Sequence, residues 1–252
     1  MVSVISKLAV CAAVMATAGS ALEVGEYYRP TGEEVSGVAG STTEYARSPC
    51  PALNALANHG YIARSGKGIT HEELQNAIVA NYNLDASVAK ALASRVPASL
   101  SLSDLGKHNF IEHDVSLVHS DSVYGDDPAA LNQTLYDDLM SRAEDGYLTL
   151  DSIAAARGSR IDACKARGDT CEFGTKQRIL GVLENAILLR CLGGFNEERI
   201  SVEYAQSFFV DERIPDDFHK SETVVSPVKL ILTATKLESK VTWSDILEFF
   251  GL

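Results

Sequence analysis

Apolar residues return every three or four positions along most of this chain, which is the periodicity of amphipathic helices. Thr70 and Glu73 have the spacing of a capping box in front of such a pattern, so we expect a helix to begin after Thr70. Asp85 is the expected start of a second helix, which ends before Pro97. We therefore expect at least two helices in the first half of the chain, each with a recognisable N-cap residue.

The same periodicity continues to the C-terminus. We interpret Asp127-Pro128 as an N-cap followed by a proline in the first helical turn, with leucines one turn apart downstream. Later helices are predicted at 149–167, 176–192, 201–211 and 227–237, with a short one after Thr242. Few windows alternate with period two, so we expect an all-α single domain of about eight to ten helices. Long irregular connections are predicted at 22–48, 98–126 and 212–226.

The N-terminus has a different composition from the rest. A single lysine precedes an uncharged apolar stretch of about 11 residues, which is too short for a membrane span, and small residues follow. We predict a secretory signal peptide over residues 1–21, cleaved after Ala21, with Ala18 as the competing site. The mature protein is then extracellular, and Asn132 opens a glycosylation sequon, so we expect a glycoprotein.

The charge balance excludes several classes of partner. The 252 residues include 22 Lys and Arg against 34 Asp and Glu, for a net charge of −12. A chain this acidic offers no basic surface to neutralise phosphates, which excludes nucleic acid and anionic membranes as partners. The chain has no Gly-x-Ser-x-Gly element or nucleotide-binding loop, and its histidines form no zinc-like pair at helical spacing.

A protein secreted through such a signal peptide folds in an oxidising compartment, where cysteines can form disulfides. Cys11 leaves with that peptide, and four cysteines remain, with three possible pairings. Cys164 and Cys171 flank a turn-forming stretch, so we predict a local disulfide between them. Cys191 is interpreted as a buried thiol, with a bridge to Cys50 or to a second copy as alternatives. The protein is thus expected as a monomer or a homodimer.

Cys50 is held between two prolines, which restrict the backbone on both sides of it. Pro51 suits the first position of a short helix that Gly60 ends, so Cys50 is the expected N-cap. Free N–H groups and the positive end of the helix dipole favour a thiolate there. A stabilised thiolate serves as a nucleophile or as a metal ligand, and the alternative for Cys50 is a half-cystine.

Three motifs in the chain together resemble a known family. The run from Ser48 to Arg64 followed by Gly68-Ile-Thr70 resembles the proximal haem segment of the fungal-type haem-thiolate peroxidases, the chloroperoxidases and unspecific peroxygenases. Glu112-His113-Asp114-Val-Ser116 is similar to the second element of that family, and Glu184 lies where the family places its distal acid. The resemblance extends from about Tyr45 to Phe218 and implies a haem-enclosing domain over 22–252.

The resemblance assigns a role to each of these residues. Cys50 would be the axial thiolate on the iron of haem b, iron protoporphyrin IX. Glu112 and Ser116, with the backbone carbonyl of His113, would hold Mg²⁺ or Mn²⁺ against a haem propionate. Glu184 would be the catalytic acid and base toward hydrogen peroxide, and His113 would hydrogen-bond to Glu184 and orient it.

Three functions remain open at this point. The resemblance favours a secreted peroxygenase that uses H₂O₂ to oxygenate small apolar organic substrates, with peroxidase activity alongside. Its length and His113, where longer peroxygenases carry glycine, place the chain with the short group of the family. The alternatives are a halide-oxidising chloroperoxidase of the same fold and a secreted helical protein that binds haem or another ligand without turnover.

Overall fold

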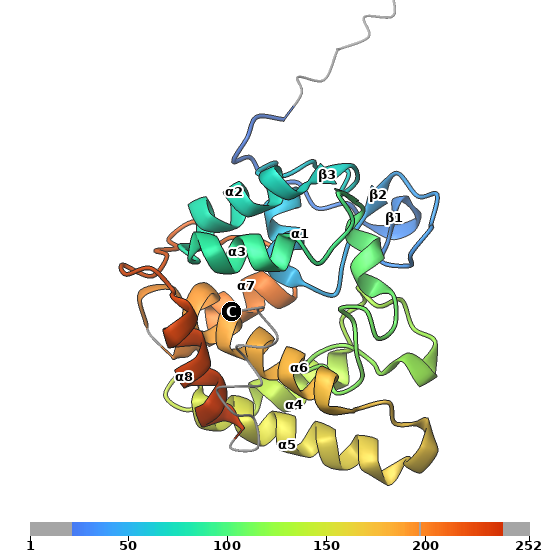
Figure 1. The fold of residues 1–252 in the computed structure, drawn as a ribbon, viewed down its shortest axis with the longest axis vertical. Helices are drawn as coiled ribbons and strands as arrows, with labels where there is room; N and C mark the ends of the chain where they lie inside the picture. Colours follow the sequence, from blue (N-terminus) through green and yellow to red (C-terminus); the bar gives the residue numbers. More distant parts are fainter. Residues whose placement is uncertain (1–21, 197, 239–252) are drawn as a thin grey trace, which may run out of the picture.

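A computed structural model describes residues 22–196 and 198–238 of the chain (Figure 1). This described part contains eight α-helices and only short strands, which confirms the prediction of an all-α single domain with about eight to ten helices. The helices are α1 (Pro51–Asn58), α2 (His71–Tyr82), α3 (Ala86–Ala93), α4 (Gln133–Met140), α5 (Leu150–Ala166), α6 (Thr175–Ile187), α7 (Val202–Phe209) and α8 (Pro227–Leu237). The predicted signal peptide and the short helix expected after Thr242 lie outside the described residues.

The described residues form three short two-stranded sheets. β1 (Val35–Ser36) pairs in parallel with β2 (Tyr45–Ala46), and β3 (Ile69–Thr70) pairs antiparallel with β4 (Ser99–Leu100). β5 (Tyr147–Thr149) pairs antiparallel with β6 (Arg199–Ser201). Two of these pairs lead directly into helices, because β3 is followed by α2, β5 by α5 and β6 by α7.

The helices form two groups around one apolar core. α2 packs on α3, and α6 packs on α8. Figure 1 shows α1, α2 and α3 together at one end of the molecule and α4, α5, α6 and α8 at the other. Fully buried side chains from both groups form the core: Leu56, Ile69, Leu100, Leu139, Ile153, Leu189, Phe208 and Leu230. None of the described helices is long and apolar enough to cross a membrane.

The helix starts follow the predicted caps at several places. The Thr70 hydroxyl accepts a hydrogen bond from the backbone N–H of Glu73, and the Asp85 carboxylate accepts one from Ser87. Pro227 occupies the first turn of α8, with Ser226 as its cap. Such side-chain acceptors satisfy N–H groups that the helix itself leaves unpaired, which is why they are readable in sequence.

The predicted helix start at Asp127-Pro128 is wrong. The Asp127 carboxylate instead accepts hydrogen bonds from the backbone N–H of Gly37 and the hydroxyl of Ser36, at 2.9 Å each. The helix α4 begins only at Gln133, and the Asn132 side chain caps it by accepting from the N–H of Leu135. The Asn132 amide nitrogen also donates to a serine hydroxyl, so the sequon side chain is already engaged within the fold.

The predicted helix over 176–192 is interrupted near its end. α6 stops at Ile187, and a π-helical turn follows over Leu188–Leu192. A π turn inserts one residue into a helix and is frequent at functional sites. Gly193 follows this turn, and a larger residue does not fit there because a Cβ would lie 2.2 Å from the carbonyl oxygen of Arg199.

Candidate active site

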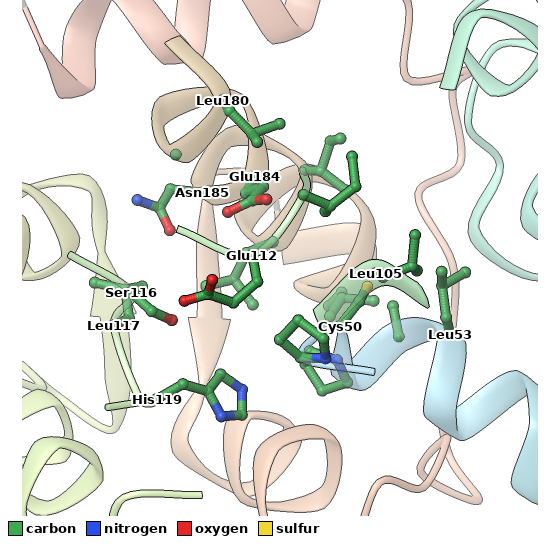
Figure 2. A pocket seen from close by; sticks show the side chains of 18 of the residues that line it. Cys50, Leu53, Leu105, Glu112, Ser116, Leu117, His119, Leu180, Glu184 and Asn185 are labelled. Atoms are coloured by element: carbon green, nitrogen blue, oxygen red, sulfur yellow. The ribbon is translucent and has the colours of Figure 1, made fainter. Parts of the chain in front are cut away.

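One apolar pocket collects the candidate site residues from three parts of the chain. Cys50 reaches it from the start of α1, Glu112, His113 and Ser116 from the connection before α4, and Glu184 from α6 (Figure 2). Aliphatic side chains make up most of the remaining lining, among them Leu53, Leu74, Ile78, Leu105, Ile111, Leu117, Leu180, Ile187, Leu188 and Leu192. The structure thus brings together residues that the sequence separates by more than a hundred positions.

Cys50 is the N-cap residue of α1, as predicted, and its thiol is free. Its backbone N–H donates to the Ser48 hydroxyl at 3.1 Å. Burial raises the pKa of the thiol to about 11, although the backbone N–H groups of Leu53 and Ala52 act in the opposite direction. Burial therefore outweighs the helix terminus in the protein alone, and a cation at the sulfur is what would hold the thiolate.

A buried polar network fixes the loop that carries Cys50, and sequence analysis missed it. The Asn54 side chain accepts from the backbone N–H of Ser48 at 2.8 Å and donates to the Glu212 carboxylate. Glu212 has a positive φ of 48° and also binds Arg29 at 3.1 Å. The one available signal is the polar spacing of Asn54 and Asn58 on an otherwise apolar helix, and nothing nearby points to Glu212.

Glu184 and His113 form a hydrogen-bonded pair on the pocket wall. Nε2 of His113 lies 3.2 Å from Oε2 of Glu184, and Nδ1 of His113 lies 2.6 Å from the carbonyl oxygen of Asp114. Because that carbonyl can only accept, Nδ1 carries a proton, and the bond between Nε2 and the carboxylate needs one further proton. The pair thus shares one mobile proton, held on either partner.

The two members of this pair have different surroundings. Burial disfavours the charged form of His113, but the nearby Glu184 carboxylate and its hydrogen bond outweigh burial and raise the pKa of His113. The side chain of His113 is 4% exposed, whereas that of Glu184 is 44% exposed because it faces the cavity. The carboxylate is thus the member of the pair that a molecule entering the pocket meets.

Glu112 and Ser116 lie together on another side of the pocket (Figure 2). Oε2 of Glu112 accepts a hydrogen bond from Nδ1 of His108 at 2.8 Å, and burial raises the pKa of Glu112 despite this partner. Among the described residues, the Ser116 hydroxyl and the Asn185 amide have no hydrogen-bond partner, although Asn185 is only 6% exposed. Polar groups of this kind are suited to a polar ligand at the edge of an apolar pocket.

A second arrangement of possible metal ligands adjoins this one. His108, Glu112 and Asp114 each offer a ligand atom within 4.8 Å of the others. His108 has no second histidine at a zinc-like helical spacing, so the sequence pattern does not mark it as a ligand. Glu112 belongs to both arrangements, so its carboxylate is the best single probe of a bound cation here.

Asp114 faces away from the pocket and anchors the neighbouring segment. Its carboxylate accepts from the backbone N–H groups of Ser122 and Glu172, at 3.1 Å each, and pairs with Arg167. The predicted disulfide between Cys164 and Cys171 is present beside it, which confirms that pairing.

Cys191 is free and buried, as the sequence interpretation preferred. Burial raises the pKa of its thiol to about 12. The side chain lines the same pocket as Cys50 from the π-helical turn. The two free cysteines therefore offer a matched pair for mutation, one at a helix N-terminus and one without that environment.

Comparison with known proteins identifies the family. The family described as "Peroxidase, family 2" matches residues 26–223. The chain belongs to this family, the fungal-type haem-thiolate peroxidases. This peroxidase is similar to aromatic peroxygenases of Coprinellus radians, at 27% identity over 207 residues, and Cyclocybe aegerita, at 26% over 205 residues. It is also similar to the chloroperoxidase of Leptoxyphium fumago, at 26% over 231 residues.

The matches differ in how much of each protein they cover. The alignment with the Coprinellus radians protein covers 69% of this peroxidase and 78% of that relative. The Cyclocybe aegerita alignment covers 69% and 55%, and the Leptoxyphium fumago alignment covers 80% and 60%, of this chain and the relative respectively. The chain therefore spans little more than half the length of two of the relatives it matches. Family membership confirms the predicted resemblance and implies haem as the cofactor.

Proposed function

We propose that this peroxidase is a secreted peroxygenase that uses H₂O₂ to oxygenate small apolar organic substrates, with one-electron peroxidase activity alongside. The observation that carries the proposal is the shared pocket of Cys50 and Glu184. A free thiol at a helix N-terminus and a cavity-facing carboxylate line one apolar space. An apolar lining suits both a porphyrin and an apolar substrate, and it excludes water from the reacting groups.

The residues present fit a haem group. Cys50 would be the iron ligand, because its free thiol lines the pocket at a helix N-terminus and a cation there would hold the thiolate form. Bound haem supplies the iron at which peroxide is activated and its oxygen transferred. The network of Ser48, Asn54 and Glu212 would keep the Cys50 loop in place during turnover.

Glu184 would move the proton in this reaction. As a carboxylate facing the cavity, it accepts a proton from one oxygen of H₂O₂ and returns it to the other, so that the oxygen–oxygen bond breaks unevenly and water leaves. His113 holds the carboxylate by its Nε2 and is itself held by the Asp114 carbonyl. One shared proton leaves the pair of Glu184 and His113 without net charge before peroxide arrives.

The polar edge of the pocket would hold a metal ion. Glu112, Ser116 and the backbone carbonyl of His113 offer hard oxygen ligands of the kind that Mg²⁺ and Mn²⁺ prefer, and a haem propionate would complete the set. His108 would orient Glu112 through the 2.8 Å hydrogen bond. The metal in turn would neutralise a carboxylate whose burial is otherwise unfavourable.

Replacing Glu112 by Gln tests the metal site. The variant removes a formal ligand charge, so we expect metal content to fall well below that of the wild type and haem to dissociate faster. Metal analysis and haem transfer to an acceptor protein measure both effects. Glu172→Gln is the matched control, because Glu172 approaches the same His108 at 3.4 Å but is exposed. Full metal occupancy in Glu112→Gln would place the ion elsewhere.

A chloroperoxidase is the second candidate function. The alignment with the Leptoxyphium fumago chloroperoxidase covers 80% of this chain, which is more than either peroxygenase alignment covers. Halide oxidation would use the same Cys50 and Glu184 with a halide in place of the organic substrate. A halide and an apolar organic molecule would thus be oxidised in the same pocket.

Two measurements on the secreted holoprotein decide between these functions. The reduced protein exposed to CO should show the strongly red-shifted Soret band of a thiolate-ligated haem. Turnover with ¹⁸O-labelled H₂O₂ should place label in the product of an apolar substrate, whereas chlorination of a diketone without that label would favour the chloroperoxidase. Bound haem with neither activity would overturn both candidates.

A further inference from the structure

Arg157 is a buried cation that the proposed function does not use. It lies on α5, is only 2% exposed and lines the pocket. One terminal nitrogen, Nη2, donates to the Glu238 carboxylate at 2.9 Å, at the end of α8. Its Nε has no hydrogen-bond partner among the described residues. A buried and partly unsatisfied guanidinium is unfavourable for folding, so its place beside the pocket needs an explanation.

The guanidinium meets His113 at a gap in α6. A Cβ added to Gly181 would lie 2.6 Å from Nη1 of Arg157 and 3.1 Å from Cε1 of His113. Gly181 precedes Glu184 by one helical turn, so the missing side chain opens a space below the carboxylate. Arg157 and His113 fill this space from two other segments. Three groups of the pocket wall therefore converge on one bare backbone position.

Ion pairing with Glu238 alone does not account for this arrangement. Glu238 also pairs with Arg178, which is 21% exposed and does not line the pocket. A carboxylate that already has a partner near the surface has no need of a second cation in the interior. Burial lowers the pKa of Arg157 to about 10, and attraction to Glu184 opposes this shift. The Glu184 carboxylate thus lies within electrostatic range of the guanidinium.

We propose that Arg157 is a positioning residue for the Glu184–His113 pair. Glu238 fixes its guanidinium, and the gap at Gly181 admits it against the edge of the His113 ring. From there its charge attracts the Glu184 carboxylate, so the carboxylate and the imidazole stay in hydrogen-bonding position on the pocket wall. The inference rests on the proposed role of Glu184 in moving the peroxide proton.

The test compares two oxidants in the holoenzyme. In Arg157→Met we expect kcat/KM for H₂O₂ to fall about 10- to 10²-fold, the size of a misplaced catalytic group. With a peracid, whose leaving group needs less protonation, we expect a change of only a few-fold. The CO-bound Soret band should stay in place, because Cys50 is untouched. Arg157→Lys keeps the positive charge but not the planar guanidinium, so its loss of kcat/KM for H₂O₂ should be smaller.

Arg178→Met is the matched control. It removes the other cation that pairs with the Glu238 carboxylate, and Arg178 does not line the pocket. We expect wild-type kinetics with both oxidants. Gly181→Ala should reproduce the selective loss with H₂O₂, since the added Cβ occupies the space of Nη1. This variant also keeps the test valid if Arg157→Met fails to fold.

Two results would overturn the inference. One is an equal loss with H₂O₂ and peracid in Arg157→Met, and the other is wild-type use of H₂O₂ in both Arg157→Met and Gly181→Ala. Either would leave Arg157 as a partner of Glu238 only. Glu184→Gln distinguishes this failure from failure of the proposed function. If that variant loses activity with H₂O₂ while the Arg157 variants do not, only the inference about Arg157 is wrong.

Discussion

Glu184→Gln is expected to lower kcat/KM for H₂O₂ by about 10²–10⁴-fold, the usual contribution of a positioned general acid and base. Glutamine has almost the same shape and can still hydrogen-bond to His113, so folding, haem binding and the thiolate spectrum should persist. It cannot take up a proton from peroxide. Stopped-flow measurement of the Soret change on mixing with H₂O₂ isolates this step from substrate binding.

A peracid provides the internal control for this variant. It should recover part of the lost rate, because a carboxylate leaves with less help from a proton. His113→Ala should lose less than Glu184→Gln, since His113 orients the carboxylate without itself meeting the peroxide. If Glu184→Gln reacts with H₂O₂ within a few-fold of the wild type, another group moves the proton.

Cys50→Ala should abolish the red-shifted CO band and most haem retention. No other sulfur lies at the N-terminus of α1, and alanine leaves the iron without a strong protein ligand there. Haem content and the absorption spectrum of the purified protein measure the effect. The loss of the cofactor should also lower the thermal stability of the variant, since a ligand that binds only the folded state stabilises it.

Cys191→Ala is the control for that experiment. Cys191 is also free, buried and at the same pocket, but it lies on the π-helical turn. We expect its variant to keep the band, with at most a small change in stability from the lost sulfur. A Cys50→Ala protein that retains the band would refute the assignment of Cys50 as the iron ligand.

Sequence reasoning succeeded where the signal is local. Caps such as Thr70 and Asp85 satisfy N–H groups within three residues, so their partners can be read from the spacing. The disulfide of Cys164 and Cys171 closes a turn of seven positions. The position of Cys50 at a helix start followed from its two prolines. In each case the physical cause lies within about two turns of the chain.

The failures come from contacts between distant segments. Asp127 has the local features of an N-cap, but the N–H of Gly37, 90 positions earlier, offers its carboxylate a competing partner. Glu212 supports Asn54 from 158 positions away, and Arg157 reaches Gly181 across a helix interface. Polar residues of this kind have no periodicity, so only the folded chain shows what they contact.

The π-helical turn at Leu188–Leu192 makes the shape of the pocket depend on chain length as well as on side-chain identity. The extra residue rotates everything after it by about 100° relative to a continuous α-helix. With the extra residue in place, the pocket is lined by Leu188, Cys191 and Leu192 of this turn. Deleting one residue of this turn would rotate Leu192 away from the pocket and bring a neighbouring side chain into it. Relatives of this enzyme could therefore diverge in substrate range through a single insertion or deletion, with every other pocket residue unchanged.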